Sequence, residues 1–343
     1  MTVRSLFSRS SSTGRRRLAG IAAVGTAAAL ALTACGGSSD PLSGGGTSAS
    51  STAASSGGGG GSLVIGSANF PESALLANIY AKALDANGVQ ATTNLNIGSR
   101  EVYLKALEDG SINLVPEYSG VLLQYFDTSA TAVSSEDVYA ALLEKTPTDL
   151  QVLDKSPAQD KDAVVVTQDT ASKYNLKSIA DLQPVAGEIV LGGPPEWATR
   201  QTGVPGLKEK YGLDFKEFKA LDAGGPLTLN ALLGDQIQAA NLFTTDPAIP
   251  ANNLVVLEDP QNLFAAENIL PLIAKSKNSP VITDTLNQVS AKLTTEDLTA
   301  LLSRVTVDKE DSVAVAEDWV SKNITAGSGS SGSSAASSTA TSG

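Results

Sequence analysis

The chain of 343 residues contains no histidine, one cysteine and one methionine, and only 5% of its residues are aromatic. The lack of histidine excludes a Ser-His-Asp triad and most zinc hydrolase sites. A single cysteine cannot form an internal disulfide or a cysteine-rich metal site. Basic residues are also scarce, since 24 Lys and Arg stand against 36 Asp and Glu, a net charge of −12. This balance lacks the basic footprint of a nucleic-acid-binding protein, and we expect no nucleic-acid partner.

The first 34 residues have the features of an export signal. They contain five arginines and no acidic residue, and they end in an apolar, alanine-rich run from Leu18 to Ala34. This run is too short and too weakly apolar for a stable membrane span, so residues 1–34 are predicted to be a cleaved signal peptide. The arginine triplet at 15–17 faintly resembles a twin-arginine signal, and both export routes stay open.

The signal ends in Leu32-Thr33-Ala34-Cys35, which matches the lipobox of bacterial lipoproteins. In a lipobox the cysteine is acylated and becomes the new N-terminus; the alternative is a chance cysteine behind an ordinary signal peptide. The match predicts an extracytoplasmic protein that is anchored to the cell membrane through Cys35. The mature chain keeps 19 basic and 36 acidic residues, a charge of −17, so the acyl chains rather than the protein surface are expected to hold it at the membrane.

Two low-complexity segments flank the part that is predicted to fold. After Cys35, 19 of the 27 residues from 36 to 62 are Gly or Ser, so 35–62 is predicted to be an acylated cysteine and a flexible tether with a reach of roughly 30 Å. The second segment, 324–343, is rich in Ser, Gly and Ala and is predicted to be disordered. Residues 63–323 remain, which is enough for one large or two medium domains.

Short apolar strands alternate with amphipathic helices over this part, which predicts an α/β protein. The first strand is expected at 63–66, and the helix after it is expected to be capped by Asn69, with Glu72 three residues later. The other predicted helices are 100–108 with Ser99 as cap, 136–145 with Ser135 as cap, a short one after Ser178, 204–211, 281–293, 295–303 and 312–321. The other predicted strands are 112–115, 163–167, 188–191, 237–243, 254–257 and 269–274.

Several short runs occur in an order and at spacings that resemble one family. They are Gly66-Ser67-Ala68-Asn69-Phe70-Pro71-Glu72-Ser73, Gly98-Ser99-Arg100-Glu101, Pro116-Glu117-Tyr118-Ser119-Gly120, Glu196-Trp197-Ala198-Thr199-Arg200, Gly203-Val204-Pro205-Gly206-Leu207, Phe243-Thr244-Thr245-Asp246 and Leu254-Val255-Val256-Leu257-Glu258-Asp259. Together they resemble the substrate-binding proteins of osmoprotectant ABC importers, which take up glycine betaine, choline, carnitine or proline betaine. The likeness extends over essentially all of 63–323.

The resemblance implies a periplasmic-binding-protein fold of type II, with two α/β lobes joined by two crossover segments and a ligand cleft between them. Lobe 1 is expected to comprise 63–168 plus 264–323, and lobe 2 to comprise 169–263. Closure of the lobes on the ligand is expected to be what the permease recognises. The implied partners are a small solute and the permease and ATPase subunits of an importer. The implied protein is a monomer without catalysis, cofactor or metal.

Family members that bind quaternary ammonium enclose it in a box of aromatic rings, because the faces of the rings attract a cation that has no N–H to donate. Tyr118 matches the family's Pro-Glu-Tyr run and is the first candidate for such a ring, the alternative being a buried strand-end tyrosine. Phe70 is expected either to face the cleft or to staple its helix to the core. Trp197 is expected either to contact the ligand or to pack a loop, and Trp319 is expected in the core.

Other positions of the box appear without their rings in this sequence. Ala265-Ala266-Glu267-Asn268 stands where the family often has Pro-Pro-Tyr-Asn, and Lys161-Asp162-Ala163 replaces an Asn-Thr-Tyr pattern. A third aromatic residue, in the helix around 227–229, is missing as well. Because each ring contributes about 0.5–2 kcal/mol of cation attraction, these losses predict a weaker ammonium site.

The remaining candidates for ligand binding are polar residues. Glu267 is expected either to meet a ligand cation or to be a solvated loop acid. Arg200 is expected either to hold a ligand carboxylate or to pair with Glu196 four residues before it. Ligands in α/β proteins bind near the carboxyl ends of strands, or at helix starts where N–H groups favour anions. The candidates of these two kinds are Thr244, Thr245, Asp246, Asn69 and Ser99.

Three alternatives remain open from the sequence. The same fold and transport role are compatible with a ligand that is not a quaternary ammonium, such as an amino-acid derivative or a sugar-like or aromatic compound. The protein is also compatible with a surface receptor that is not coupled to uptake. An enzyme such as a glycosidase, with Glu117 and Glu267 as acid and base, has no supporting motif beyond the carboxylates themselves.

Overall fold

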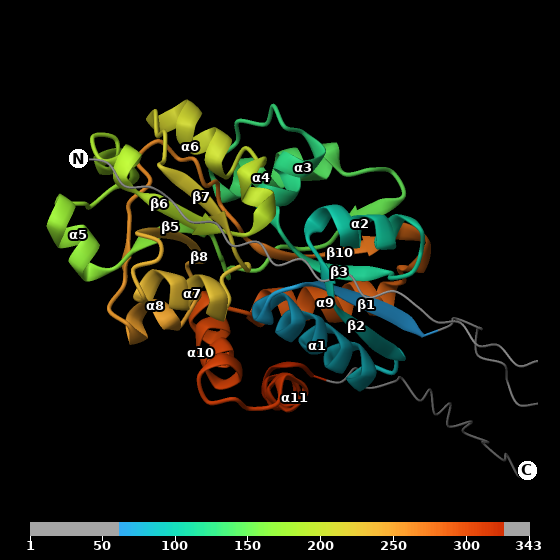
Figure 1. Ribbon diagram of the computed structural model, residues 1–343. Helices are drawn as coiled ribbons and strands as arrows, with labels where there is room; N and C mark the ends of the chain where they lie inside the picture. The colour runs from blue at the N-terminus through green and yellow to red at the C-terminus, as the bar shows by residue number, and fades with distance from the viewer. Residues whose placement is uncertain (1–61, 326–343) are drawn as a thin grey trace, which may run out of the picture. The chain divides into compact units, whose positions relative to one another are not determined.

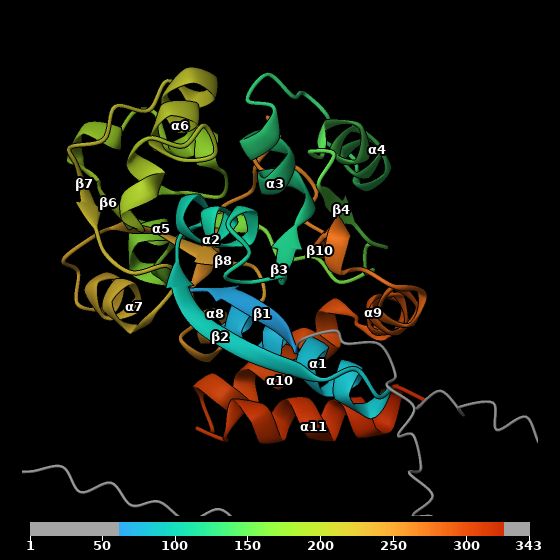
Figure 2. The same ribbon diagram turned by 90° about the vertical axis from the view of Figure 1, so that its right-hand side faces the viewer.

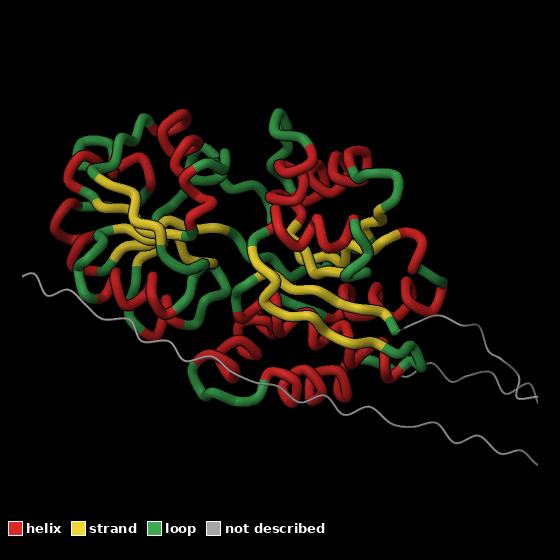
Figure 3. Tube along the Cα trace, turned by 45° about the vertical axis from the view of Figure 1, so that its right-hand side comes forward, coloured by secondary structure: helices red, strands yellow, loops and turns green. Residues whose placement is uncertain are grey.

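The computed structural model describes residues 62–325, which belong to one compact unit. The predicted signal peptide, Cys35, nearly all of the tether and most of the predicted tail lie outside the described residues. Two five-stranded sheets form the two halves of the unit, and each is covered by helices (Figures 1 and 3). We call each sheet with its helices a lobe. No helix within residues 62–325 has both the length and the apolar character needed to cross a membrane.

The sheet of lobe 1 has the strand order β2-β1-β3-β10-β4. Strands β1, β2 and β3 run parallel to one another, whereas β10 pairs antiparallel with both β3 and β4. The strands are β1 (Leu63–Ala68), β2 (Ala91–Gly98), β3 (Leu114–Tyr118), β4 (Leu150–Val152) and β10 (Ile269–Ala274). The helices are α1 (Pro71–Ala86), α2 (Arg100–Glu108), α3 (Ser119–Phe126), α4 (Ser135–Lys145), η4 (Lys275–Lys277), α9 (Pro280–Lys292), α10 (Thr295–Thr306) and α11 (Ser312–Asn323).

Helix α1 is the central helix of one face of this lobe. Its apolar residues recur at helical spacing and are buried from Leu75 to Leu84, with Pro71 in its first turn. Helix α11 runs beside α1 (Figure 2), and its Trp319 is buried in the core as predicted. Ile324 is also buried in this cluster, so the predicted disordered tail is wrong at its first residue.

The sheet of lobe 2 has the strand order β7-β6-β8-β5-β9. Its strands are β5 (Asp162–Val166), β6 (Val190–Gly193), β7 (Glu217–Ala220), β8 (Ala239–Phe243) and β9 (Val255–Val256). Its helices are α5 (Gln168–Tyr174), η1 (Ile179–Leu182), η2 (Ala186–Glu188), η3 (Pro195–Ala198), α6 (Val204–Tyr211), α7 (Pro226–Leu233) and α8 (Ala248–Ala251). Strand β5 pairs antiparallel with β8 and β9, while β6 runs parallel to β7 and β8.

The two sheets share one topology, although the sequence shows no repeat. In each sheet the first three strands are parallel, and the fourth strand is antiparallel to the third and to the fifth. One predicted boundary is therefore wrong: residues 162–166, assigned to lobe 1, form β5 in the sheet of lobe 2. At the second crossover, Phe264 packs in the core of lobe 2 rather than of lobe 1. The pattern of apolar residues predicted a strand at 163–167, one residue from the observed β5, but it carries no information about which sheet the strand joins.

Two predicted helix caps are also wrong, each by one residue. Phe70, not Asn69, occupies the cap position of α1, and Ser134, not Ser135, accepts the N–H of Asp137 at the start of α4. Ser99 does stand at the cap position of α2, but its hydroxyl donates to the carboxylate of Glu101. Glu72, predicted as a capping partner, is buried inside the protein instead.

Candidate functional site: a cleft between the two lobes

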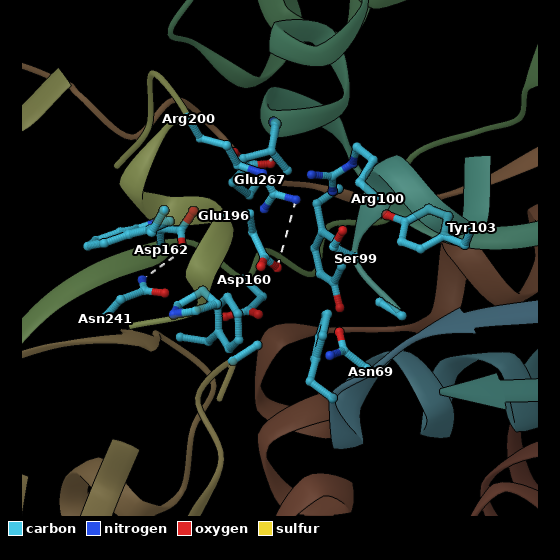
Figure 4. A pocket seen from close by; sticks show the side chains of 18 residues that line it. Asn69, Ser99, Arg100, Tyr103, Asp160, Asp162, Glu196, Arg200, Asn241 and Glu267 are labelled. Carbon is cyan, nitrogen blue, oxygen red and sulfur yellow. Dashed lines mark hydrogen bonds and ion pairs between the residues drawn. The ribbon is translucent and has the colours of Figure 1, made fainter. Parts of the chain in front are cut away.

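A cavity lies between the two lobes and encloses about 590 Å³ of space, its open mouth included. Both lobes and both crossover segments contribute side chains, and Figure 4 shows those of Ser99, Arg100 and Tyr103 facing those of Asp162, Glu196 and Asn241. The lining residues are Ala68, Asn69, Phe70, Ser99, Arg100, Tyr103, Tyr118, Val121, Asp160, Asp162, Pro194, Glu196, Trp197, Arg200, Ala223, Asn241, Phe243 and Glu267.

Aromatic rings form a large part of the lining. Phe70 lies between two of them, with its ring centroid 6.0 Å from that of Tyr118 and 5.1 Å from that of Phe243. Tyr103 of α2 and Trp197 of η3 complete the set. Neither Tyr103 nor Phe243 is at one of the three positions where this sequence lacks a ring that the family has. The cleft therefore contains more rings than the sequence predicted.

Phe70 and Trp197 each line the cleft and also pack in a core. Phe70 lines the cleft and also packs against the core of lobe 1, because it stands at the N-terminal end of α1. Trp197 lines the cleft, yet only 1% of its surface is exposed, and its ring stacks on that of Phe264 in the core of lobe 2.

Tyr118 is positioned by the end of β3. It is buried, and its hydroxyl donates a hydrogen bond of 2.8 Å to Oε1 of Glu72 at the start of α1. Burial raises the pKa of Tyr118 well above its usual value, so the hydroxyl is a donor at every physiological pH. The ring is therefore held in one orientation at the edge of the cleft.

A buried ion pair supports the lobe 1 side of the cleft. Arg100 is 8% exposed and Glu117 is fully buried, and Nε and Nη2 of Arg100 donate to the two oxygens of Glu117 at 2.8–3.2 Å. The hydroxyl of Tyr103 donates to the same carboxylate at 2.7 Å. Glu117 is thus held by Arg100 and Tyr103, and it is not among the residues that line the cleft.

A second ion pair crosses from one lobe to the other. Nε and Nη2 of Arg200 donate to the carboxylate of Glu101 on α2 at 3.0 and 2.9 Å. Glu196, the predicted partner, is more distant, with its Oε1 4.0 Å from Nη2. Burial alone would raise the pKa of Glu101, but the bonds from Arg200 and Ser99 outweigh it and lower that pKa to about 2. Arg200 therefore connects the lobes at the rim of the cleft, a role that the sequence did not predict.

Acidic groups outnumber basic ones in the lining. Four acids line the cleft, namely Asp160, Asp162, Glu196 and Glu267. Among the described residues of the lining, the basic ones are Arg100 and Arg200, and each already faces a carboxylate outside this set. Burial raises the pKa of Asp160, Asp162 and Glu267 because a charged carboxylate is poorly solvated there. A cation in the cleft would compensate these acids and draw them into their ionised forms.

Glu267 is only 3% exposed, which contradicts its alternative as a solvated loop acid. Its Oε2 accepts the backbone N–H groups of Gly120 and Val121, the free donors at the start of α3, at 2.9 and 3.1 Å. Gly120 permits this approach, because a Cβ at that position would lie 2.6 Å from Oε1 of Glu267. Burial raises the pKa of Glu267 to about 8, even though the bond from Val121 lowers it.

The three candidates at the end of β8 do not line the cleft. Thr244 is exposed and accepts the N–H of Lys161. Thr245 is buried, with its hydroxyl donating to Oε2 of Glu72 and its N–H donating to Oδ1 of Asp160. Asp246 accepts the N–H of Ala248 at the start of α8. By contrast, Asn69 and Ser99 lie on the cleft, as the sequence suggested.

Sequence reasoning missed five prominent lining residues: Tyr103, Asp160, Asp162, Asn241 and Phe243. A signal existed for two of them, since Asp160 and Asp162 alternate directly before the buried run 163–166 and so share one side of the chain. Asn241 is fully buried within β8, and its Nδ2 donates to Oδ1 of Asp162 at 2.8 Å. That bond fixes the side-chain orientation, and Oδ1 of Asn241 has no hydrogen-bond partner among the described residues.

The two sheets of equal topology, with a polar and aromatic cleft between them, define a periplasmic binding protein of type II. Residues 61–322 match the family described as the substrate binding domain of ABC-type glycine betaine transport systems, and the chain belongs to this family.

Relatives and solved structures agree with this assignment. The glycine betaine-binding protein YehZ of Escherichia coli is 27% identical over 270 residues, which cover 75% of this chain and 88% of YehZ. The carnitine transport binding protein OpuCC of Listeria monocytogenes is 25% identical over 266 residues, which cover 76% and 86% of the two chains. A crystal structure titled as a glycine betaine/carnitine/choline ABC transporter has the same fold, with a TM-score of 0.61 and 24% identity over 76% of this chain and 98% of the other.

The protein is accordingly a substrate-binding protein of the osmoprotectant family of ABC importers, and it binds its ligand in a cleft. Proteins of this family act outside the cytoplasm and deliver small solutes to an ABC permease.

Proposed function

We propose that this protein captures a small quaternary ammonium osmoprotectant in the cleft between its lobes and delivers it unchanged to its permease and ATPase. The observation that carries this proposal is the lining of the cleft, in which five aromatic rings surround a space with more acidic than basic groups. Ring faces and carboxylates both attract a cation, and the methyl groups of a quaternary ammonium fill the space between rings. A betaine carboxylate would meet the positive charge of Arg100 and Arg200, which line the same cleft.

The ligand-binding role of the individual residues belongs to this proposal. Tyr118, Phe70, Trp197 and Phe243 are assigned to the ammonium group, and Glu267 with Asp162 to its charge. Support for this assignment comes from their common place in the lining. The proposal also includes acylation of Cys35, a monomeric state and the absence of catalysis, supported by the lipobox sequence and by the family.

Replacing Tyr118 by alanine is expected to weaken the binding of choline and glycine betaine by about 2- to 30-fold. The reason is the loss of one ring–cation contact, which contributes about 0.5–2 kcal/mol. Isothermal titration of the full chain with glycine betaine, choline, carnitine, proline betaine and proline measures the effect. Tyr125→Ala is the matched control, because Tyr125 is an exposed tyrosine that does not line the cleft.

Two results of this titration would speak against the proposal. Equal affinities of wild type and Tyr118→Ala would show that the ring of Tyr118 does not contribute to ligand binding. If none of the five solutes gives a binding signal, the fold and the family assignment still hold. The ligand would then be an amino-acid derivative, a sugar-like compound or an aromatic compound.

Ionisation of Glu267, whose pKa is about 8, is expected to raise the affinity for choline roughly tenfold. Below that pH the carboxyl is protonated and neutral, and above it the negative charge attracts the cation. If the bound cation lowers this pKa by about one unit, the affinity changes about tenfold. At pH 7 the binding of choline should therefore release protons, which titrations in buffers of different ionisation enthalpy detect.

Glu267→Gln is the control for this pH effect. The amide cannot ionise, so its variant should lose both the proton release and the rise in affinity. The same proton release in Glu267→Gln as in wild type would assign the titration to another acid of the cleft.

A further inference from the structure

A pair of buried acids lies behind the cleft, at the point where the two lobes meet. Glu72 belongs to α1 of lobe 1, and Asp160 to the crossover that leads into β5 of lobe 2. They are 2% and 3% exposed. None of the ion pairs within residues 62–325 includes either of them. Two ionised carboxylates without a cation are unstable in such surroundings.

Hydrogen bonds connect this pair to both lobes. Thr245 of lobe 2 donates its hydroxyl to Oε2 of Glu72 and its N–H to Oδ1 of Asp160 at 3.1 Å. Glu72 also accepts the hydroxyl of Tyr118 through Oε1. One carboxyl group thus holds a ring of the cleft and, at the same time, a residue of the opposite lobe.

Thr245 brings the two carboxyl groups together, because it donates its hydroxyl to Glu72 and its N–H to Asp160. No donor of the described residues reaches Oδ2 of Asp160. A proton on one of the two acids removes one of the two charges, as in other pairs of neighbouring carboxyls. In agreement, burial and the neighbouring charge raise the pKa of Asp160 well above its usual value, and burial raises that of Glu72.

We propose that Glu72 is a positioning residue for ligand binding: it shares a proton with Asp160, and the protonated pair fixes Tyr118 in the cleft and ties the lobes together through Thr245. The part that concerns Tyr118 rests on the proposed function of the cleft. Loss of the proton leaves two adjacent negative charges, which repel each other and favour the entry of water. The pKa is raised in this structure, where Thr245 of lobe 2 bonds Glu72 of lobe 1, so this arrangement of the lobes holds the proton more firmly. Raising the pH through this pKa therefore shifts the lobes toward an arrangement in which they are farther apart.

Other titratable groups face the pair and have to be separated from it. Tyr118 of β3 and Asp246 after β8 lie near Glu72, and Asp246 raises the pKa of Glu72 by its charge. On the cleft side, Asp160 shares the lining with Asp162, Glu196, Glu267, Arg100 and Arg200. Ionisation of Glu267 has the opposite effect, because it raises the affinity for a cation as the pH rises. Binding is therefore measured in the Glu267→Gln background.

The test measures the separation of the lobes without ligand and, in parallel, the affinity for choline. Spin labels at Val102 on α2 and Leu227 on α7, both exposed, report the separation in the full chain carrying Cys35→Ser. Measurements at about pH 6 and about pH 9 bracket the range in which buried carboxyls titrate. The variants are Glu72→Gln and, as matched control, Glu101→Gln, since Glu101 also joins lobe 1 to lobe 2 but is paired with Arg200.

We expect the labels of the wild type to move apart at the higher pH. In the Glu267→Gln background, choline should bind at least tenfold more weakly there. In Glu72→Gln the amide N–H donates to ionised Asp160 in place of the shared proton, so separation and affinity should no longer depend on pH. Glu101→Gln should keep the pH response of the wild type. Identical pH responses of wild type and Glu72→Gln would overturn the proposal, whether both respond or neither does.

The two proposals fail separately in this design. If choline and betaine fail to bind while the lobe separation responds to pH only when Glu72 is present, the role of Glu72 in closure is supported and the proposed ligand is wrong. If they bind to both proteins with the same pH profile, the ligand stands and the role of Glu72 is overturned.

Discussion

Replacing Glu117 by alanine is expected to lower the free energy of unfolding by about 3–5 kcal/mol, the effect of removing one partner from a buried ion pair. The fully buried carboxylate of Glu117 receives two N–H groups of Arg100, the hydroxyl of Tyr103 and the N–H of Tyr118. The substitution leaves the charge of Arg100 and two further donors without an acceptor. Unfolding in urea, followed by circular dichroism, measures the loss.

Two comparisons make this prediction specific. Glu101→Ala removes the carboxylate from the half-exposed pair with Arg200 and should cost only about 0–1 kcal/mol. The double variant Arg100→Met with Glu117→Leu removes both charges and should recover most of the stability, because apolar side chains of similar volume replace a buried pair well. If Glu117→Ala were as stable as Glu101→Ala, the ion pair would not be a structural element of lobe 1.

Replacing Trp197 by alanine is expected to destabilise the protein by about 3–5 kcal/mol, the usual cost of removing a buried aromatic side chain. Trp197 is 1% exposed and stacks on Phe264, with ring centroids 6.1 Å apart and planes at 12°. Its removal leaves a cavity in the core of lobe 2 and opens the wall of the cleft. The shift of the urea midpoint gives the stability change, and titration with choline gives the change in affinity.

The controls for Trp197 separate packing from binding. Trp197→Phe keeps a ring against Phe264 and should retain most of the stability. Leu233→Ala alters a side chain that is 45% exposed on α7 and should change the free energy of unfolding by less than about 0.5 kcal/mol. A Trp197→Ala protein that unfolds at the urea midpoint of the wild type would contradict the place of Trp197 in the core.

The buried acids also explain why pH is a useful variable for this protein. Glu267 and the pair of Glu72 and Asp160 titrate in surroundings where burial raises their pKa values. Glu267 faces the ligand, so its ionisation favours a bound cation. The pair faces the contact between the lobes, so its ionisation opposes closure. The wild-type profile combines both effects, and the single variants Glu267→Gln and Glu72→Gln separate them.

Local signals in the sequence were sufficient to predict several elements of the fold. The predicted helices Arg100–Glu108 and Val204–Tyr211 and the strand Ile269–Ala274 agree with the structure at both ends. Periodicity of apolar residues and helix-ending glycines are encoded within a few positions, so these elements can be recognised without their neighbours. The ordered motifs identified the family in the same way, and seven of the ten candidate ligand residues line the cleft.

The contacts between distant elements and side chains could not be predicted from local signals. Strand β5 joins the second sheet, Arg200 pairs with Glu101 across 99 positions of the chain, and Glu72 bonds Thr245 across 173. Hydrophobic periodicity shows which side of an element is buried, but it does not show which other element covers that side. For the same reason Glu72 looked like a local capping residue in the sequence. Its burial between the lobes depends on contacts that form only when both sheets and both crossovers are in place.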